Sequence, residues 1–147
     1  MKKFRNSYAA YMLLYSFYFM STSLFTTLIS VYLMGKHYSA TQVSTLVSIA
    51  FFLSMVAQPF FGYINERFGI VKMTTLSLSV IIGGVFGFLW APNLFWLTVF
   101  YGIVLVCLNG TAPMMEVFAT QSPYAFGKIR VWGTIGYSVG VQIAGWV

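Results

Sequence analysis

Three long stretches without a charged residue constrain this chain more than any other feature. They run from Asn6 to Gly35, from Tyr38 to Asn65 and from Met73 to Met115. A helix needs roughly 20 apolar residues to cross about 30 Å of hydrocarbon, so the first two stretches each accommodate one pass and the third accommodates two. Buried helices of soluble proteins are shorter and carry polar residues on one face. The pattern therefore predicts an all-α integral membrane protein.

The breaks between the apolar runs predict about five transmembrane helices. The expected spans are residues 7–34, 41–64, 73–90, 94–120 and 126–147, and together they form one transmembrane portion covering residues 1–147. The fifth apolar run continues to Val147, so no loop follows it and the number of spans is odd. We therefore expect the chain to be the incomplete N-terminal part of a longer protein or a truncated gene product.

The basic residues predict the orientation of these spans. The chain has a formal net charge of +6, and seven of its eight basic residues fall on one side when the spans are threaded in order through a bilayer. These seven are Lys2, Lys3, Arg5, Arg67, Lys72, Lys128 and Arg130. Because cytoplasmic loops carry the excess of Lys and Arg, the N-terminus is expected in the cytoplasm and Lys36 outside. The basic residues form no stripe on a soluble surface, so nucleic acid is not an expected partner.

The usual signatures of catalysis are missing from the sequence. There is no glycine-rich phosphate loop with Lys and Ser, no cluster of His and Cys that could bind a metal, and no combination of Ser, His and Asp typical of hydrolases. We therefore expect no catalytic residue, no metal and no organic cofactor, and we do not expect an enzyme.

Glu116 is the ionisable residue that lies deepest in an apolar span, and Arg130 is its expected partner. A carboxylate inside a membrane costs about 2.5 kcal/mol or more, so it usually has a partner or lines a wet cavity. Glu116 and Arg130 each lie seven residues from Pro123, which is in the connecting turn. At a rise of about 1.5 Å per residue, both reach the same depth on antiparallel helices. The pair could bind a ligand, or it could only fasten two helices together.

Polar neighbours share a helical face with each of these two residues. Asn109 and Pro113 precede Glu116 at helical spacing, and Thr134 and Tyr137 follow Arg130 in the same way. A polar stripe inside a membrane helix faces protein or water. An amide, a carboxylate, a guanidinium, a hydroxyl and an aromatic ring suit a polyhydroxylated ligand such as a sugar.

One cytoplasmic turn carries a recognisable motif. Its glycine, acidic and basic residues resemble the signature loop between helices two and three of the major facilitator superfamily, and the matching positions are Gly62, Glu66, Arg67, Gly69 and Lys72. This resemblance implies a loop that controls the switch between inward and outward states. Gly69 can adopt a positive φ, Gly62 can allow close helix contact, and the charges can bridge helix ends.

Further segments resemble the lactose permease branch, the oligosaccharide and proton symporters. They are Gln58 to Gly62, Asn109 to Phe118 and Phe126 to Gly133. The resemblance implies that Glu116 and Arg130 bind sugar hydroxyls, that Tyr137 stacks on the sugar ring, and that a missing C-terminal half supplies the proton-coupling residues. We therefore expect proton-coupled sugar symport in the cell membrane. The alternatives are a carrier of the same fold for an aromatic acid, nucleoside or drug, and a truncated remnant that does not transport.

Overall fold

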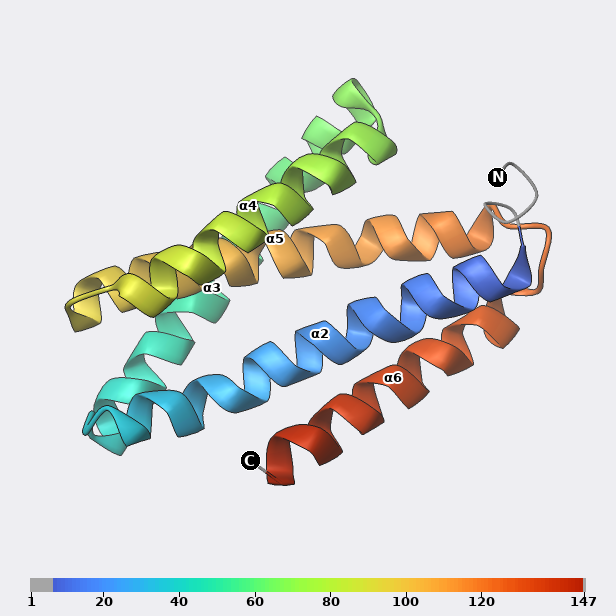
Figure 1. The fold of residues 1–147 in the computed structure, drawn as a ribbon. Helices are drawn as coiled ribbons and strands as arrows, with labels where there is room; N and C mark the ends of the chain where they lie inside the picture. Colours follow the sequence, from blue (N-terminus) through green and yellow to red (C-terminus); the bar gives the residue numbers. More distant parts are fainter. Residues whose placement is uncertain (1–6, 147) are drawn as a thin grey trace. The chain divides into compact units, whose positions relative to one another are not determined.

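A computed structural model describes residues 7–146 of the chain, so Lys2, Lys3, Arg5 and Val147 lie outside the described residues. Within this range the protein is α-helical and contains no β-strand, as the sequence predicts. The helices, labelled in Figure 1, are α2 (Tyr8–Gly35), α3 (Ala40–Phe68), α4 (Ile70–Trp90), α5 (Leu94–Thr120) and α6 (Phe126–Trp146).

Four helices, α2 to α5, are long and apolar enough to cross a membrane. Helix α6 has 21 residues, which is also enough to span a bilayer. Its sequence is less apolar because it contains Lys128, Arg130 and several glycines. The fifth transmembrane span therefore stays a prediction.

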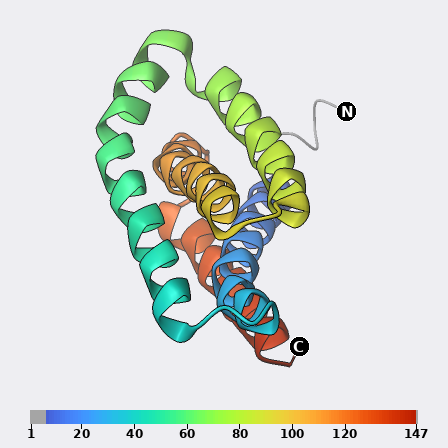
Figure 2. The same cartoon turned by 90° about the vertical axis from the view of Figure 1, so that its left-hand side faces the viewer.

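The junction between α3 and α4 is tighter than the sequence predicts. The expected spans 41–64 and 73–90 leave residues 65–72 outside the helices, but α3 continues to Phe68 and only Gly69 interrupts the helices. Figure 2 shows the resulting sharp bend between α3 and α4. Gly69 has a φ of +87°, a left-handed conformation that glycine adopts without steric cost. Glu66 and Arg67 consequently belong to the last turn of α3 rather than to a loop.

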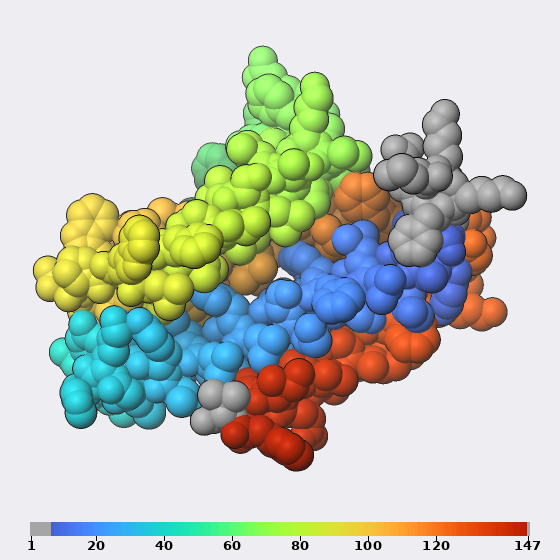
Figure 3. Space-filling model, in the orientation of Figure 1, coloured from blue at the N-terminus to red at the C-terminus, as the bar shows by residue number. Residues whose placement is uncertain are grey.

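The chain forms two compact units, and the first consists of α2, the end of α5 from Met115, and α6. Helices α2 and α6 lie side by side (Figure 1), and their surfaces adjoin in Figure 3. The buried face of α6 consists mainly of small residues: Ile129, Gly133, Gly136, Gly140 and Ala144. The Ser16 hydroxyl of α2 donates a hydrogen bond to the Trp132 carbonyl, 3.1 Å away. Gly136 and Gly140 allow this close approach of the helices, because a Cβ atom at either would overlap the backbone of α2.

The second unit contains α3, α4 and α5 up to Met114. Here α4 meets α5 where Gly84 faces Val104 and Gly87 faces the ring of Phe100. By contrast, no atom lies within 4 Å of a Cβ built at Gly83. Gly84, one residue further along the helix, makes the close contact instead.

The topology prediction can be tested with single cysteines at positions 36, 72 and 128 in a Cys107→Ser background. Lys36 follows the end of α2, Lys72 lies in the first turn of α4 and Lys128 lies in the first turn of α6. We expect an impermeant thiol reagent added to sealed cells to modify only the cysteine at position 36, because the basic residues of the other two ends belong inside. Permeabilised cells, in which all three should react, provide the control. Labelling from outside at position 72 or 128 would contradict the predicted orientation of the spans.

Candidate functional site

Glu116 and Arg130 meet within the first unit. Helix α5 ends at Thr120 and α6 begins at Phe126, so the short connection brings the two residues to the same level. The Arg130 Nη1 atom lies 3.6 Å from the Glu116 Oε1 atom, and the two side chains are 61% and 50% exposed, respectively. This distance is too long for a hydrogen bond. The hydrogen-bonding groups of both side chains are therefore available to a ligand.

Phe126 positions the guanidinium of Arg130. The Arg130 Cζ atom lies 5.6 Å from the centre of the Phe126 ring, a cation–π contact one helical turn apart on α6. Such a contact leaves the planar donors of the guanidinium free, because the ring occupies a face and not an N–H group. Arg130 is thus held without losing its capacity to bind two oxygen atoms at once.

Thr134 and Tyr137 lie on the exposed part of α6, as Arg130 does. Tyr137 is 45% exposed, so its ring is open to a ligand. The spacing from Arg130 to Thr134 and Tyr137 places all three on one helical face. The arrangement offers a donor fork, a hydroxyl and an aromatic surface in sequence along the helix.

The remaining predicted site residue, Asn109, belongs to the second unit. Its side-chain amide donates a hydrogen bond to the Ser54 hydroxyl of α3, 2.8 Å away. Ser54 is buried, which makes this bond part of the packing between α3 and α5. Asn109 therefore has a structural partner of its own, and its role in binding solute stays a prediction.

An aromatic cluster surrounds the start of α6. The Trp132 Nε1 atom donates a hydrogen bond to the Tyr8 hydroxyl at 2.9 Å, and that hydroxyl donates to the Lys128 carbonyl at 3.1 Å. The Tyr124 ring meets the Tyr8 ring edge-on, with centres 5.2 Å apart. These contacts fix the first turns of α2 and α6 together, two residues from Arg130.

The motif at the end of α3 has the predicted glycine conformation but not all of the predicted contacts. A Cβ atom at Gly62 would have no neighbour within 4 Å, so Gly62 makes no close helix contact within the described part of the chain. Glu66, Arg67 and Lys72 form no ion pair among residues 7–146. The predicted role of Gly62 in close helix contact is therefore not supported within residues 7–146.

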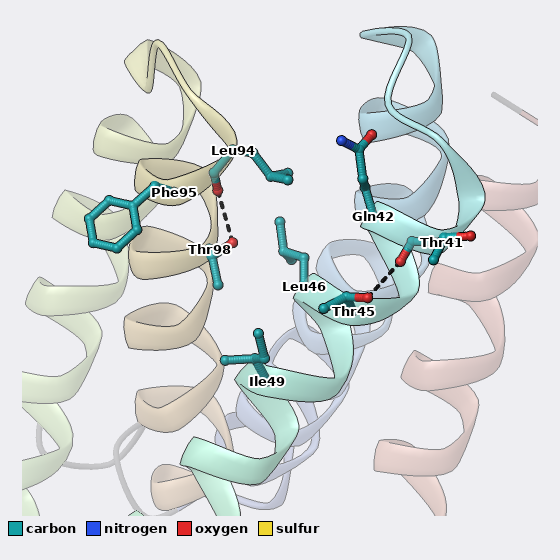
Figure 4. Close-up of a pocket in the computed structure, with 8 residues that line it drawn as sticks. All are labelled: Thr41, Gln42, Thr45, Leu46, Ile49, Leu94, Phe95 and Thr98. Carbon is teal, nitrogen blue, oxygen red and sulfur yellow. Dashed lines mark hydrogen bonds between the residues drawn. The ribbon is translucent and has the colours of Figure 1, made fainter.

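A groove in the second unit lies between the first turns of α3 and α5 (Figure 4). Its volume is about 360 Å³, and its lining includes Leu46, Ile49 and Phe95. The hydroxyls of Thr45 and Thr98 each donate to a carbonyl of their own helix at 2.8 Å. With two of its hydroxyls already bonded and no charged side chain in its lining, this groove suits a polar solute less well than the Glu116 and Arg130 pair does.

Sequence reasoning missed Phe126 and Ser54. Phe126 could have been found, because an aromatic residue four positions before an arginine lies on the same face of a helix. Ser54 carries no such signal, since its partner Asn109 lies 55 positions away.

The chain matches a family model and is similar to curated permeases. The MFS_1 like family matches residues 8–147. The sucrose permease of Escherichia coli is 28% identical over 97% of this chain and 38% of its own length. The maltose permease of Geobacillus stearothermophilus is 24% identical over 82% of this chain and 32% of its own length. The chain thus spans less than two fifths of these curated relatives. No solved structure matches it.

Proposed function

Because the chain belongs to the MFS_1 like family of the major facilitator superfamily, we propose that it forms the N-terminal part of a secondary transporter for a sugar or oligosaccharide. The chain is a multi-pass membrane protein, and we place it in the cell membrane. Coupling of transport to a proton is part of the proposal, with the coupling residues in the C-terminal half of the transporter. In this family two helical halves rock around a central site, and these residues would contribute one wall of that site.

The half-exposed contact between Glu116 and Arg130 carries the proposal. A carboxylate accepts hydrogen bonds from sugar hydroxyls, and a guanidinium donates two in parallel to neighbouring oxygen atoms. At 3.6 Å the two groups are close enough to reduce each other's desolvation cost without using up their hydrogen bonds. The names of the two relatives, sucrose permease and maltose permease, support a sugar as the solute.

Conservative substitutions test the binding role. In the whole transporter polypeptide, Glu116→Gln and Arg130→Lys should each weaken sugar binding at least tenfold, about 1.4 kcal/mol. The amide loses the charge, and the lysine loses the planar fork while keeping the charge. Calorimetry with sucrose, maltose and lactose in detergent measures the affinities, and sugar-driven proton uptake into proteoliposomes measures the coupling.

Ser138→Ala is the matched control on α6, because the Ser138 hydroxyl donates to the Thr134 carbonyl of its own helix and is not a predicted ligand. It should leave the affinity within about twofold, less than half a kcal/mol. Unchanged sugar affinity in both charge variants would remove the site from the proposal. Failure of the unmodified transporter to bind any of the three sugars would favour a carrier of another solute.

We also propose that the turn around Gly69 acts in switching between inward and outward states, together with Gly62, Glu66, Arg67 and Lys72. The positive φ of Gly69 supports this role, because it lets α3 and α4 reverse direction within one residue. The charged side chains of the motif are unpaired among residues 7–146. They are therefore free to contact other parts of a whole transporter.

A further inference from the structure

The hydroxyl of Tyr15 is buried in the first unit and has no hydrogen-bond partner there. The side chain is only 1% exposed. Its ring packs against α6 at Gly133, where a Cβ atom would lie 2.9 Å from the Tyr15 Cδ1 atom. A buried donor without a partner is unfavourable, and such groups in native proteins usually acquire a partner in some state of the molecule.

The charged groups that interact with Tyr15 are those of the candidate site. Gly133 lies three residues from Arg130 on α6, so the Tyr15 ring packs against α6 about one helical turn from the position of Arg130. The Tyr15 hydroxyl lies within electrostatic range of both Glu116 and Arg130. The carboxylate can accept a hydrogen bond from a hydroxyl, whereas the guanidinium has only donors.

The Glu116 carboxylate is partly exposed and makes no hydrogen bond to Arg130. Its only charged contact among the described residues is the 3.6 Å approach to Arg130, and half of its side chain is exposed. A solute that binds the guanidinium can separate it from the carboxylate, because no hydrogen bond joins the two groups. The carboxylate then loses its neighbouring cation, and the Tyr15 hydroxyl is a buried donor without a hydrogen-bond partner among residues 7–146.

We propose that Tyr15 is a positioning residue for Glu116: when solute opens the contact between Glu116 and Arg130, the Tyr15 hydroxyl donates a hydrogen bond to the released carboxylate. Without solute this hydroxyl has no partner in the first unit. With solute bound, it holds the Glu116 carboxylate in its binding position. The inference rests on the proposed function only in naming a solute as the agent that opens the pair.

A thermal-stability cycle on the whole transporter polypeptide tests the new hydrogen bond without any solute. In the native background, Tyr15→Phe removes a buried hydroxyl that has no partner, so we expect the melting temperature of the empty protein to rise by about 2 °C. In an Arg130→Ala background the carboxylate is released permanently. Tyr15→Phe should there lower the melting temperature by about the same amount, because the hydroxyl now has a partner to lose.

Tyr18→Phe is the matched control, because Tyr18 is also buried and lies on the same helix. Its effect should be equal in the two backgrounds. An equal change in melting temperature on Tyr15→Phe in the two backgrounds would overturn the proposal. The hydroxyl would then contribute the same stability whether or not Arg130 is paired with Glu116.

Binding measurements supply the second arm of the test. Tyr15→Phe should weaken sucrose binding about fivefold in the native background and less than about twofold in a Glu116→Gln background, as expected for a residue that acts through Glu116. Equal losses in the two backgrounds would contradict the proposal. If the unmodified transporter binds no sugar, the proposed function fails, and the stability cycle still decides the role of Tyr15.

Discussion

Exchanging the two charges of the candidate site, Glu116→Arg with Arg130→Glu, is expected to give a transporter that folds and yet does not bind its sugar. Opposite charges remain side by side after the exchange, so the attraction between α5 and α6 is preserved. The hydrogen-bond acceptor and the donor fork have, however, changed places relative to the solute. We expect the affinity to fall at least a hundredfold, about 2.8 kcal/mol, as measured by calorimetry with sucrose in detergent.

The geometry of the pair explains why folding should survive. A half-exposed ion pair whose atoms are 3.6 Å apart contributes less than about 1 kcal/mol to stability. The melting temperature of the exchanged transporter should therefore stay within about 3 °C of the original. The single reversals, which place two like charges together, are the controls and should be less stable than the exchange. Near-normal sugar binding by the exchanged protein would reduce the pair to a contact that fastens two helices.

Much of this fold could be predicted because membrane helices leave strong signals in sequence. The expected span 94–120 coincides with α5, and the other starts and ends fall within four residues of the helices. The difference at residues 65–72 has a physical cause. Charged residues are typical of a turn between membrane helices, but Glu66 and Arg67 are good helix formers, and only Gly69 has the conformation that ends α3.

The candidate site was predictable only where local spacing determines it. Glu116 and Arg130 flank one short turn, so counting residues from Pro123 was enough to bring them together. Contacts between segments far apart in the sequence have no such signal. Counting along one helix could not show that Ser54 engages Asn109, or that the Tyr15 hydroxyl is buried against Gly133 without a partner.

The largest effect on folding is expected from Gly136→Val on the buried face of α6. A Cβ atom at this position would overlap the carbonyl oxygen and the Cα atom of Ser16 on α2. Backbone atoms cannot move aside as the end of a flexible side chain can, so the two helices would have to separate along their contact. Overpacking of this kind costs about 3 kcal/mol or more. We expect the yield of monodisperse transporter after detergent extraction to fall at least fivefold, since about 1 kcal/mol alone is a fivefold change in a folding equilibrium.

Two variants on the same helix separate this contact from the general cost of a β-branched residue. Gly145→Val has no neighbour within 4 Å of the new Cβ atom, so it should be extracted as well as the unmodified protein. Gly133→Ala should lie between the two, because its Cβ atom would meet the rings of Tyr15 and Phe19, which can rotate away. If Gly136→Val behaved like Gly145→Val, α2 and α6 would not pack through this glycine. Arg130 and Tyr15, which lie on the two helices of that contact, would then lose the arrangement on which the candidate site depends.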